Sequence, residues 1–183
     1  THLSIPLPLK FLKEYDIKNL VLNKNFSLCI DINGNKTYLP KWFNSKVIMN
    51  EEIIQIKSKY KHTLYLNNFN KILSMGSNSH GQLGIFSKFS IKPRYIKLLD
   101  AVKIISIEVS KNTSFAISEN GDVYSFGSNT FGELGQGINI PNSFTPLKID
   151  TLKKIKKIYA GDFHVFAIDE NNILYGWGDN NRN

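Results

Sequence analysis

The sequence has 183 residues, which is enough for one ordinary domain or two small ones. Its 42% hydrophobic and 21% charged residues are typical of a folded globule and exclude a disordered tail. The single cysteine, Cys29, excludes an internal disulfide and a cysteine-rich metal site. No apolar run approaches the roughly 18 residues that a membrane-spanning helix needs, so we expect no membrane span, and the compartment stays open.

The net charge of +8 raises nucleic acid or an acidic protein as a partner. Nearly all the cations are lysines, however, and only Arg94 and Arg182 are arginines, the residue type that binds phosphate and guanine bidentately. Lysine, asparagine and isoleucine are all frequent, as an AT-biased coding sequence would favour. We therefore expect a solvated lysine surface, while nucleic-acid contact through lysine-rich loops such as residues 153–157 remains an alternative.

Residues 8–49 form the first expected unit, which is degenerate. Residues 8–10 (PLK) match residues 146–148 (PLK), and at the same offset Cys29 meets Ala167 on an expected strand. The unit lacks the glycine-rich loop of the later units and contains the first tryptophan, Trp42. We expect a shortened unit in which Cys29 is a small core residue rather than a nucleophile.

Residues 50–101 form the second unit, with a glycine-rich loop at 75–84 (MGSNSHGQLG). Glycines supply positive φ and close backbone approach, asparagine bonds neighbouring backbone groups, and leucine anchors the loop. A phosphate cradle is the functional alternative, but the spacing fits neither nucleotide-binding glycine motif and no helix follows. We expect a geometric role for the residues of this motif: Gly76, Asn78, Gly81, Leu83 and Gly84.

Residues 102–151 repeat the pattern, with a loop at 126–135 (FGSNTFGELG). The short runs at 115–117 and 123–126 predict strands, and the Asn120-Gly121 step between them predicts a hairpin with a type I′ turn. The segments after Pro93 and Pro146 are expected edge strands, where the missing N–H of proline is tolerated. The motif residues of this copy are Gly127, Asn129, Gly132, Leu134 and Gly135.

Residues 152–183 form an incomplete last unit that holds Gly178 and Asn180 in the same frame. Gly127 follows Gly76 by 51 residues, and Gly178 follows Gly127 by the same step. Four short strands in about 50 residues, with no helical period, are typical of β-propeller blades. We predict an all-β fold, a partial β-propeller of about three to four four-stranded antiparallel blades within one domain over residues 1–183.

The pattern resembles the repeat of the regulator of chromosome condensation family. Residues 121–135 (GDVYSFGSNTFGELG) closely match its signature, and residues 161–168 (GDFHVFAI) resemble its Gly-x-x-His strand. The resemblance extends from about residue 53 to residue 180 and is marginal before that. It implies a seven-bladed propeller, which at this period needs about 350 residues, so we expect further blades or a partner protein to cover the exposed blade faces.

His62 and His164 occupy the same position of the repeat. The resemblance implies that His164 and its counterpart are structural histidines that bond loop backbone rather than ligands or bases. The carboxylates are scattered, and no nucleophile–base pair or metal-ligand spacing is visible. We expect no enzymatic activity, no cofactor and no metal.

Aromatic residues in or beside the inter-strand loops are candidates for a protein-binding rim, namely Phe86, Phe89, Phe131 and Phe144. The alternative is that they pack onto their own blade; rigid scaffolds, however, often carry function on loops. The leading hypothesis is a non-enzymatic propeller scaffold that binds protein, as part of a longer propeller or a multi-subunit complex. The resemblance implies guanine-nucleotide exchange on a small GTPase as an alternative, and a nucleic-acid-associated role in chromatin or ribosome assembly is a third.

Overall fold

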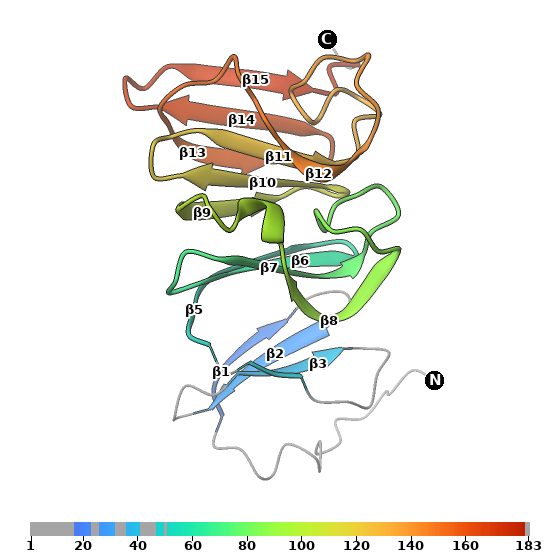
Figure 1. Ribbon diagram of the computed structural model, residues 1–183, viewed down its shortest axis with the longest axis vertical. Helices are drawn as coiled ribbons and strands as arrows, with labels where there is room; N and C mark the ends of the chain where they lie inside the picture. The colour runs from blue at the N-terminus through green and yellow to red at the C-terminus, as the bar shows by residue number, and fades with distance from the viewer. Residues whose placement is uncertain (1–16, 23–25, 32–35, 41–46, 50, 182–183) are drawn as a thin grey trace. The chain divides into compact units, whose positions relative to one another are not determined.

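The computed structural model describes residues 17–22, 26–31, 36–40, 47–49 and 51–181 (Figure 1). The described residues form antiparallel sheets and a single turn of 3-10 helix, η2 (Lys97–Leu99). The chain divides into two compact units, Thr1–Asn50 and Glu51–Asn183, and each is described by itself. Within the described residues, no helix is long and apolar enough to cross a membrane. The all-β prediction is confirmed.

The N-terminal unit contains blade I, an antiparallel sheet with the strand order β1-β2-β3-β4. Its strands are β1 (Ile17–Leu22), β2 (Phe26–Asp31), β3 (Lys36–Pro40) and β4 (Val47–Met49). The backbone of Cys29 pairs with those of Leu20 and Thr37, in the middle of β2. The expectations for residues 8–10, for Trp42 and for the Cys29 side chain lie outside the described part of the chain.

The C-terminal unit begins with blade II, whose strand order is β5-β6-β7-β8. Its strands are β5 (Ile53–Lys59), β6 (His62–Asn67), β7 (Ile72–Ser77) and β8 (Phe89–Tyr95). Pro93 lies within the edge strand β8 rather than before it. The sequence therefore predicted the edge position correctly, but it placed the start of the strand too late.

Blade III repeats this arrangement with the strand order β12-β11-β10-β9. Its strands are β9 (Ile104–Val109), β10 (Thr113–Ser118), β11 (Val123–Gly127) and β12 (Ser143–Lys148). Pro146 lies inside β12, which is again the edge strand of the sheet. A proline fits there because one side of an edge strand has no ladder hydrogen bonds to lose.

Blade IV has three strands in the order β13-β14-β15. They are β13 (Ile155–Ala160), β14 (His164–Asp169) and β15 (Leu174–Gly178). Strand β9 contacts both β5 and β13, so the first strands of successive blades lie next to one another. Within the C-terminal unit, blade III lies between blades II and IV (Figure 1).

The turn between the second and third strands differs from the predicted type I′. Gly121 has a φ of 77°, whereas Asn120 is not among the residues with positive φ, and type I′ requires positive φ at both central residues. The equivalent residues in the neighbouring blades, Asn70 and Asn172, have φ values of 61° and 66°. Each turn thus uses one left-handed residue, and asparagine replaces glycine at modest strain.

The hydrophobic core of the C-terminal unit lies between blades. One buried cluster joins residues of blades II and III, including Leu64 and Ile107, and a second joins blades III and IV, including Phe115 and Val165. A polar contact also crosses the interface between blades II and III, where Lys57 Nζ donates to Glu108 Oε2 at 2.6 Å. Successive blades therefore stabilise one another, as tandem repeats require.

Candidate functional site

Three glycines at the ends of the third strands have the same surroundings. Gly76, Gly127 and Gly178 have φ values of 115°, 119° and 100°. A β-carbon at these positions would lie 2.2, 2.3 and 2.3 Å from the carbonyl oxygens of Lys61, Asn112 and Phe163, respectively. No side chain fits so close to a backbone oxygen. Each glycine therefore lets the third strand approach the first hairpin turn of its own blade.

Asn78 organises the loop that follows Gly76. Its side-chain Nδ2 donates to the carbonyl oxygens of Ile85 and Ser87 at 2.7 and 2.6 Å. Its Oδ1 accepts a hydrogen bond from the backbone N–H of Leu83 at 2.7 Å. The side chain of Leu83 is buried, so the amide and the leucine together hold the loop against the blade.

Asn129 makes the same set of bonds one blade later. Its Nδ2 donates to the carbonyl oxygens of Gly137 and Ile140 at 2.9 and 2.7 Å, and its Oδ1 accepts from Leu134 N at 2.9 Å. Asparagine and leucine at the same spacing therefore hold the glycine-rich loop in both blades. Asn180, the third member of the series, is exposed.

The last glycine of each loop lies against the next blade. A β-carbon on Gly84 would lie 3.0 Å from the Phe126 ring, and one on Gly135 would lie 3.1 Å from Ile149 and 3.2 Å from Trp177 Nε1. Trp177 Nε1 also donates to the carbonyl oxygen of Glu133 at 2.8 Å. Glycine therefore allows an aromatic side chain of the following blade to pack beneath the loop.

The middle glycines of the two loops are less alike. A β-carbon on Gly81 would lie 2.1 Å from the carbonyl oxygen of Ser143, in the neighbouring blade. A β-carbon on Gly132 would have a side-chain carbon of Ile138 as its nearest neighbour, at an ordinary contact distance of 3.7 Å. Both glycines have positive φ, at 94° and 79°. They therefore share a conformational role, but only Gly81 is also needed for close packing.

The two equivalent histidines have different environments. His62 is buried, and its Nε2 bonds the Ser114 hydroxyl at 3.0 Å, across the interface between blades II and III. Burial lowers the pKa of His62 from 6.5 to about 3. The expected bond to loop backbone is therefore wrong for His62. His164 is exposed, and its ring lies 5.8 Å from that of Phe166.

The candidate rim residues lie at one end of the blades, which we call the loop-bearing end. Strand pairing brings His62 opposite Gly76 and Thr113 opposite Gly127, so the first hairpin turns and the glycine-rich loops share this end (right in Figure 1). Phe86, Phe89, Phe131 and Phe144 are all exposed there. Phe86 has 83% of its surface exposed, and Ile138, in the corresponding loop of blade III, has 84%.

The opposite end of the blades carries ion pairs beside exposed apolar residues such as Phe69 and Ile173. Its hairpin and connecting segments carry three ion pairs: Lys103–Glu119, Lys148–Asp122 and Lys154–Glu170. The Tyr95 hydroxyl donates to Glu51 at this end, and burial together with this bond raises the pKa of Tyr95 to about 12. At the loop-bearing end, Lys59 and Asp162 also form an ion pair, at 3.0 Å.

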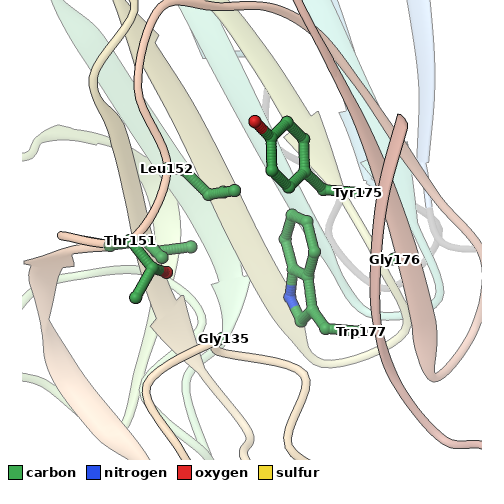
Figure 2. A pocket seen from close by; sticks show the side chains of 7 residues that line it. Gly135, Thr151, Leu152, Tyr175, Gly176 and Trp177 are labelled. Atoms are coloured by element: carbon green, nitrogen blue, oxygen red, sulfur yellow. The ribbon is translucent and has the colours of Figure 1, made fainter. Parts of the chain in front are cut away.

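A shallow hollow lies between blades III and IV. Figure 2 shows Tyr175 and Trp177 facing Leu152 and Thr151 across it. Its volume is about 190 Å³, below the roughly 300 Å³ at which ligand pockets begin. Within the described residues, no group of three or more His, Cys, Asp or Glu side chains could hold a metal ion. The hollow marks imperfect packing between blades.

The sequence analysis missed one set of residues at the loop-bearing end. Lys111 Nζ lies 5.5 Å from the centre of the Tyr60 ring and 4.7 Å from that of Phe163. These residues come from the first hairpin turns of three successive blades. The 51-residue spacing could have revealed that the turns are equivalent, but not that their side chains meet.

Two sequence models of the regulator of chromosome condensation (RCC1) repeat match this chain. One covers residues 70–117 and 120–168, and the other covers residues 104–133 and 155–183. The human protein named probable E3 ubiquitin-protein ligase HERC6 is 33% identical over 132 residues, which span 70% of this chain and 13% of HERC6. The guanine nucleotide exchange factor SRM1 of Saccharomyces cerevisiae is 32% identical over 142 residues, or 67% of this chain and 29% of SRM1.

A solved structure shows the same fold. Yeast RCC1 (Prp20), in a crystal structure with Kap60, aligns with a TM-score of 0.72 and 26% identity over 91% of this chain and 44% of that one. The chain thus spans less than half the length of these three relatives. The partial propeller and its tandem repeats are confirmed. This chain belongs to the regulator of chromosome condensation (RCC1) repeat family.

Proposed function

We propose that the chain is a non-enzymatic β-propeller scaffold that binds protein through its loop-bearing end, within a longer propeller or a larger assembly. The observation that carries this proposal is the exposure of apolar loop side chains at the loop-bearing end. Phe86 and Ile138 are more than four-fifths exposed there, which is more than any other large hydrophobic residue in the described part of the chain. Clustered exposed apolar side chains on a rigid scaffold favour a binding surface.

The repetition of the motif supports a geometric role rather than catalysis. The side-chain Nδ2 and Oδ1 atoms of Asn78 and Asn129 all bond to loop backbone. The side chains of Leu83 and Leu134 are buried. A catalytic group has to reach a substrate, and these side chains are committed to holding loops. The similarity to HERC6 covers 13% of that ligase, so the ligase activity in its name is not proposed for this chain.

Blade IV supports the proposal that further structure covers the chain. Phe166 and Leu174 are 43% and 62% exposed, whereas their equivalents in blade III, Phe115 and Val123, are fully buried against the next blade. A sheet face of this composition is stable when another sheet packs on it. The proposed cover is a further blade of the same repeat.

The scaffold function is tested by variants at the two ends. Phe86→Asp places a charge at the loop-bearing end, and Phe69→Asp makes the same change at an exposed phenylalanine of the opposite end. Quantitative affinity capture with each variant should show defined partners that Phe86→Asp loses and Phe69→Asp keeps. Equal recovery with both variants would refute binding through the loop-bearing end.

Guanine-nucleotide exchange is the second candidate, because SRM1 is named as an exchange factor and is 32% identical over the matched region. The test is release of a labelled guanine nucleotide from a purified small GTPase, with the chain in excess. Faster release would favour exchange and would argue against a purely passive scaffold. An unchanged rate across a panel of GTPases would remove exchange as a property of this chain.

A further inference from the structure

We propose that a strip of lysine and aromatic side chains at the loop-bearing end binds an acidic protein segment. The lysine–aromatic strip consists of Tyr60, Lys61, Lys111, Phe131 and Phe163. The inference rests on the proposed protein-binding function and names the chemistry of the partner. It is carried by the contacts, the backbone and the charges of the first hairpin turns in blades II, III and IV.

The side chains of the strip form one continuous row across the three blades. Lys61 Nζ lies 5.2 Å from the centre of the Tyr60 ring. Lys111 Nζ lies between the rings of Tyr60 and Phe163, at 5.5 and 4.7 Å from their centres. Phe163 and Phe131 make an edge-to-face contact with ring centres 5.0 Å apart. Each lysine of the row therefore lies against an aromatic ring, and the row ends in a pair of rings.

The backbone holds these turns firmly. The N–H groups of the residues after Gly76, Gly127 and Gly178 donate to the turn carbonyls of Lys61, Asn112 and Phe163 at 2.8, 2.9 and 2.8 Å. Tyr60 has a φ of 52°, a left-handed conformation that costs an ordinary residue about 1–2 kcal/mol. A bulky aromatic residue held in this conformation at a turn points to a functional position.

The two lysines of the strip carry positive charge that no ion pair within the described residues compensates. No ion pair involves Lys61 or Lys111 among residues 51–181. The acidic side chain in the third turn, Asp162, pairs with Lys59 at 3.0 Å, which neutralises both. At the opposite end, Lys103, Lys148 and Lys154 are paired with carboxylates instead. An incoming carboxylate would therefore find free ammonium groups at the strip.

The ring geometry favours an acidic protein segment over nucleic acid. Single-stranded nucleic acids bind by stacking their bases on open aromatic faces. Here lysine ammonium groups already lie over the faces of Tyr60 and Phe163. Carboxylates can bond the outward N–H groups of these lysines, while apolar residues of the same segment pack beside Phe131. Charge complementarity of this kind sets specificity and association rate.

The test uses the full chain and a fluorescein-labelled peptide in which aspartate alternates with leucine. We expect binding by fluorescence anisotropy that weakens as salt is added, and no binding of the matched peptide with serine in place of aspartate. Lys61→Glu combined with Lys111→Glu should weaken peptide binding by about tenfold or more. Lys61→Glu alone, at an exposed residue of the turn, should weaken it in the same direction and provides a variant with little risk to folding.

The matched control is Lys103→Glu combined with Lys154→Glu, which makes the same change in net charge at the opposite end. We expect this variant to bind the acidic peptide like the original chain. Equal losses in the two double variants, no peptide binding, or tighter strip-dependent binding of oligothymidylate would each overturn the proposal. If Phe86→Asp loses captured partners while the strip variants keep both partners and peptide binding, the scaffold function stands and the strip proposal fails.

Discussion

Ser114 accepts a hydrogen bond from His62 across the interface between blades II and III. The Ser114 hydroxyl donates its proton to the carbonyl oxygen of Gln82 at 2.7 Å, so its oxygen can only accept from His62 Nε2 at 3.0 Å. The imidazole therefore carries a proton on Nε2, and burial, which lowers its pKa, keeps it neutral. Its Nδ1 is buried and has no hydrogen-bond partner among the described residues, which makes a second proton unfavourable there.

This histidine should make stability depend on pH. Its pKa is about 3 in the folded chain against 6.5 in the unfolded chain, so the unfolded state binds the proton more tightly. The free energy of unfolding should fall as the pH drops below 6.5, by about 2 kcal/mol between neutral pH and about pH 5. Chemical denaturation at several pH values in this range measures how the free energy of unfolding changes with pH. His62→Gln should make this dependence weaker. An unchanged pH dependence in that variant would show that His62 does not titrate on unfolding.

Gly127 should not tolerate a side chain. Gly127→Ala adds a β-carbon 2.3 Å from the carbonyl oxygen of Asn112 at a φ of 119°, and it should destabilise the fold by about 2 kcal/mol or more. The control is Gly137→Ala, where φ is 83° and no atom lies within 4 Å of the added carbon. That variant should lose only the conformational preference, about 1 kcal/mol. Denaturant midpoints of the two variants give the comparison, and equal losses would contradict the close-approach role.

The sequence predicted the elements of this fold better than the contacts between them. The glycine spacing predicted blades and loops, and the prolines marked the edge strands, because these features depend on local backbone conformation. The bond between His62 and Ser114 and the row through Lys111 depend on how one blade is rotated onto the next. Neighbouring-blade contacts of this kind leave no local pattern, so the histidine was assigned the wrong partner.

Phe115 and Phe166 occupy the same repeat position and should respond differently to the same substitution. Phe115 is fully buried between blades III and IV, whereas Phe166 is 43% exposed. Phe115→Ala should destabilise the chain by about 3–5 kcal/mol. Phe166→Ala should change stability by less than about 1 kcal/mol and should reduce binding of a hydrophobic dye. Similar losses in thermal or denaturant unfolding would show that the blade IV face is already covered in solution.

The central claim is that the repeated asparagines serve geometry rather than ligand contact, and hydrogen exchange at one amide tests it most directly. Asn129→Ala removes the acceptor of Leu134 N–H and the donor to the Gly137 and Ile140 carbonyl oxygens. We predict much faster exchange of the Leu134 amide and a loss of about 1–3 kcal/mol in stability. Leu134 protection equal to that of the original chain would contradict the claim.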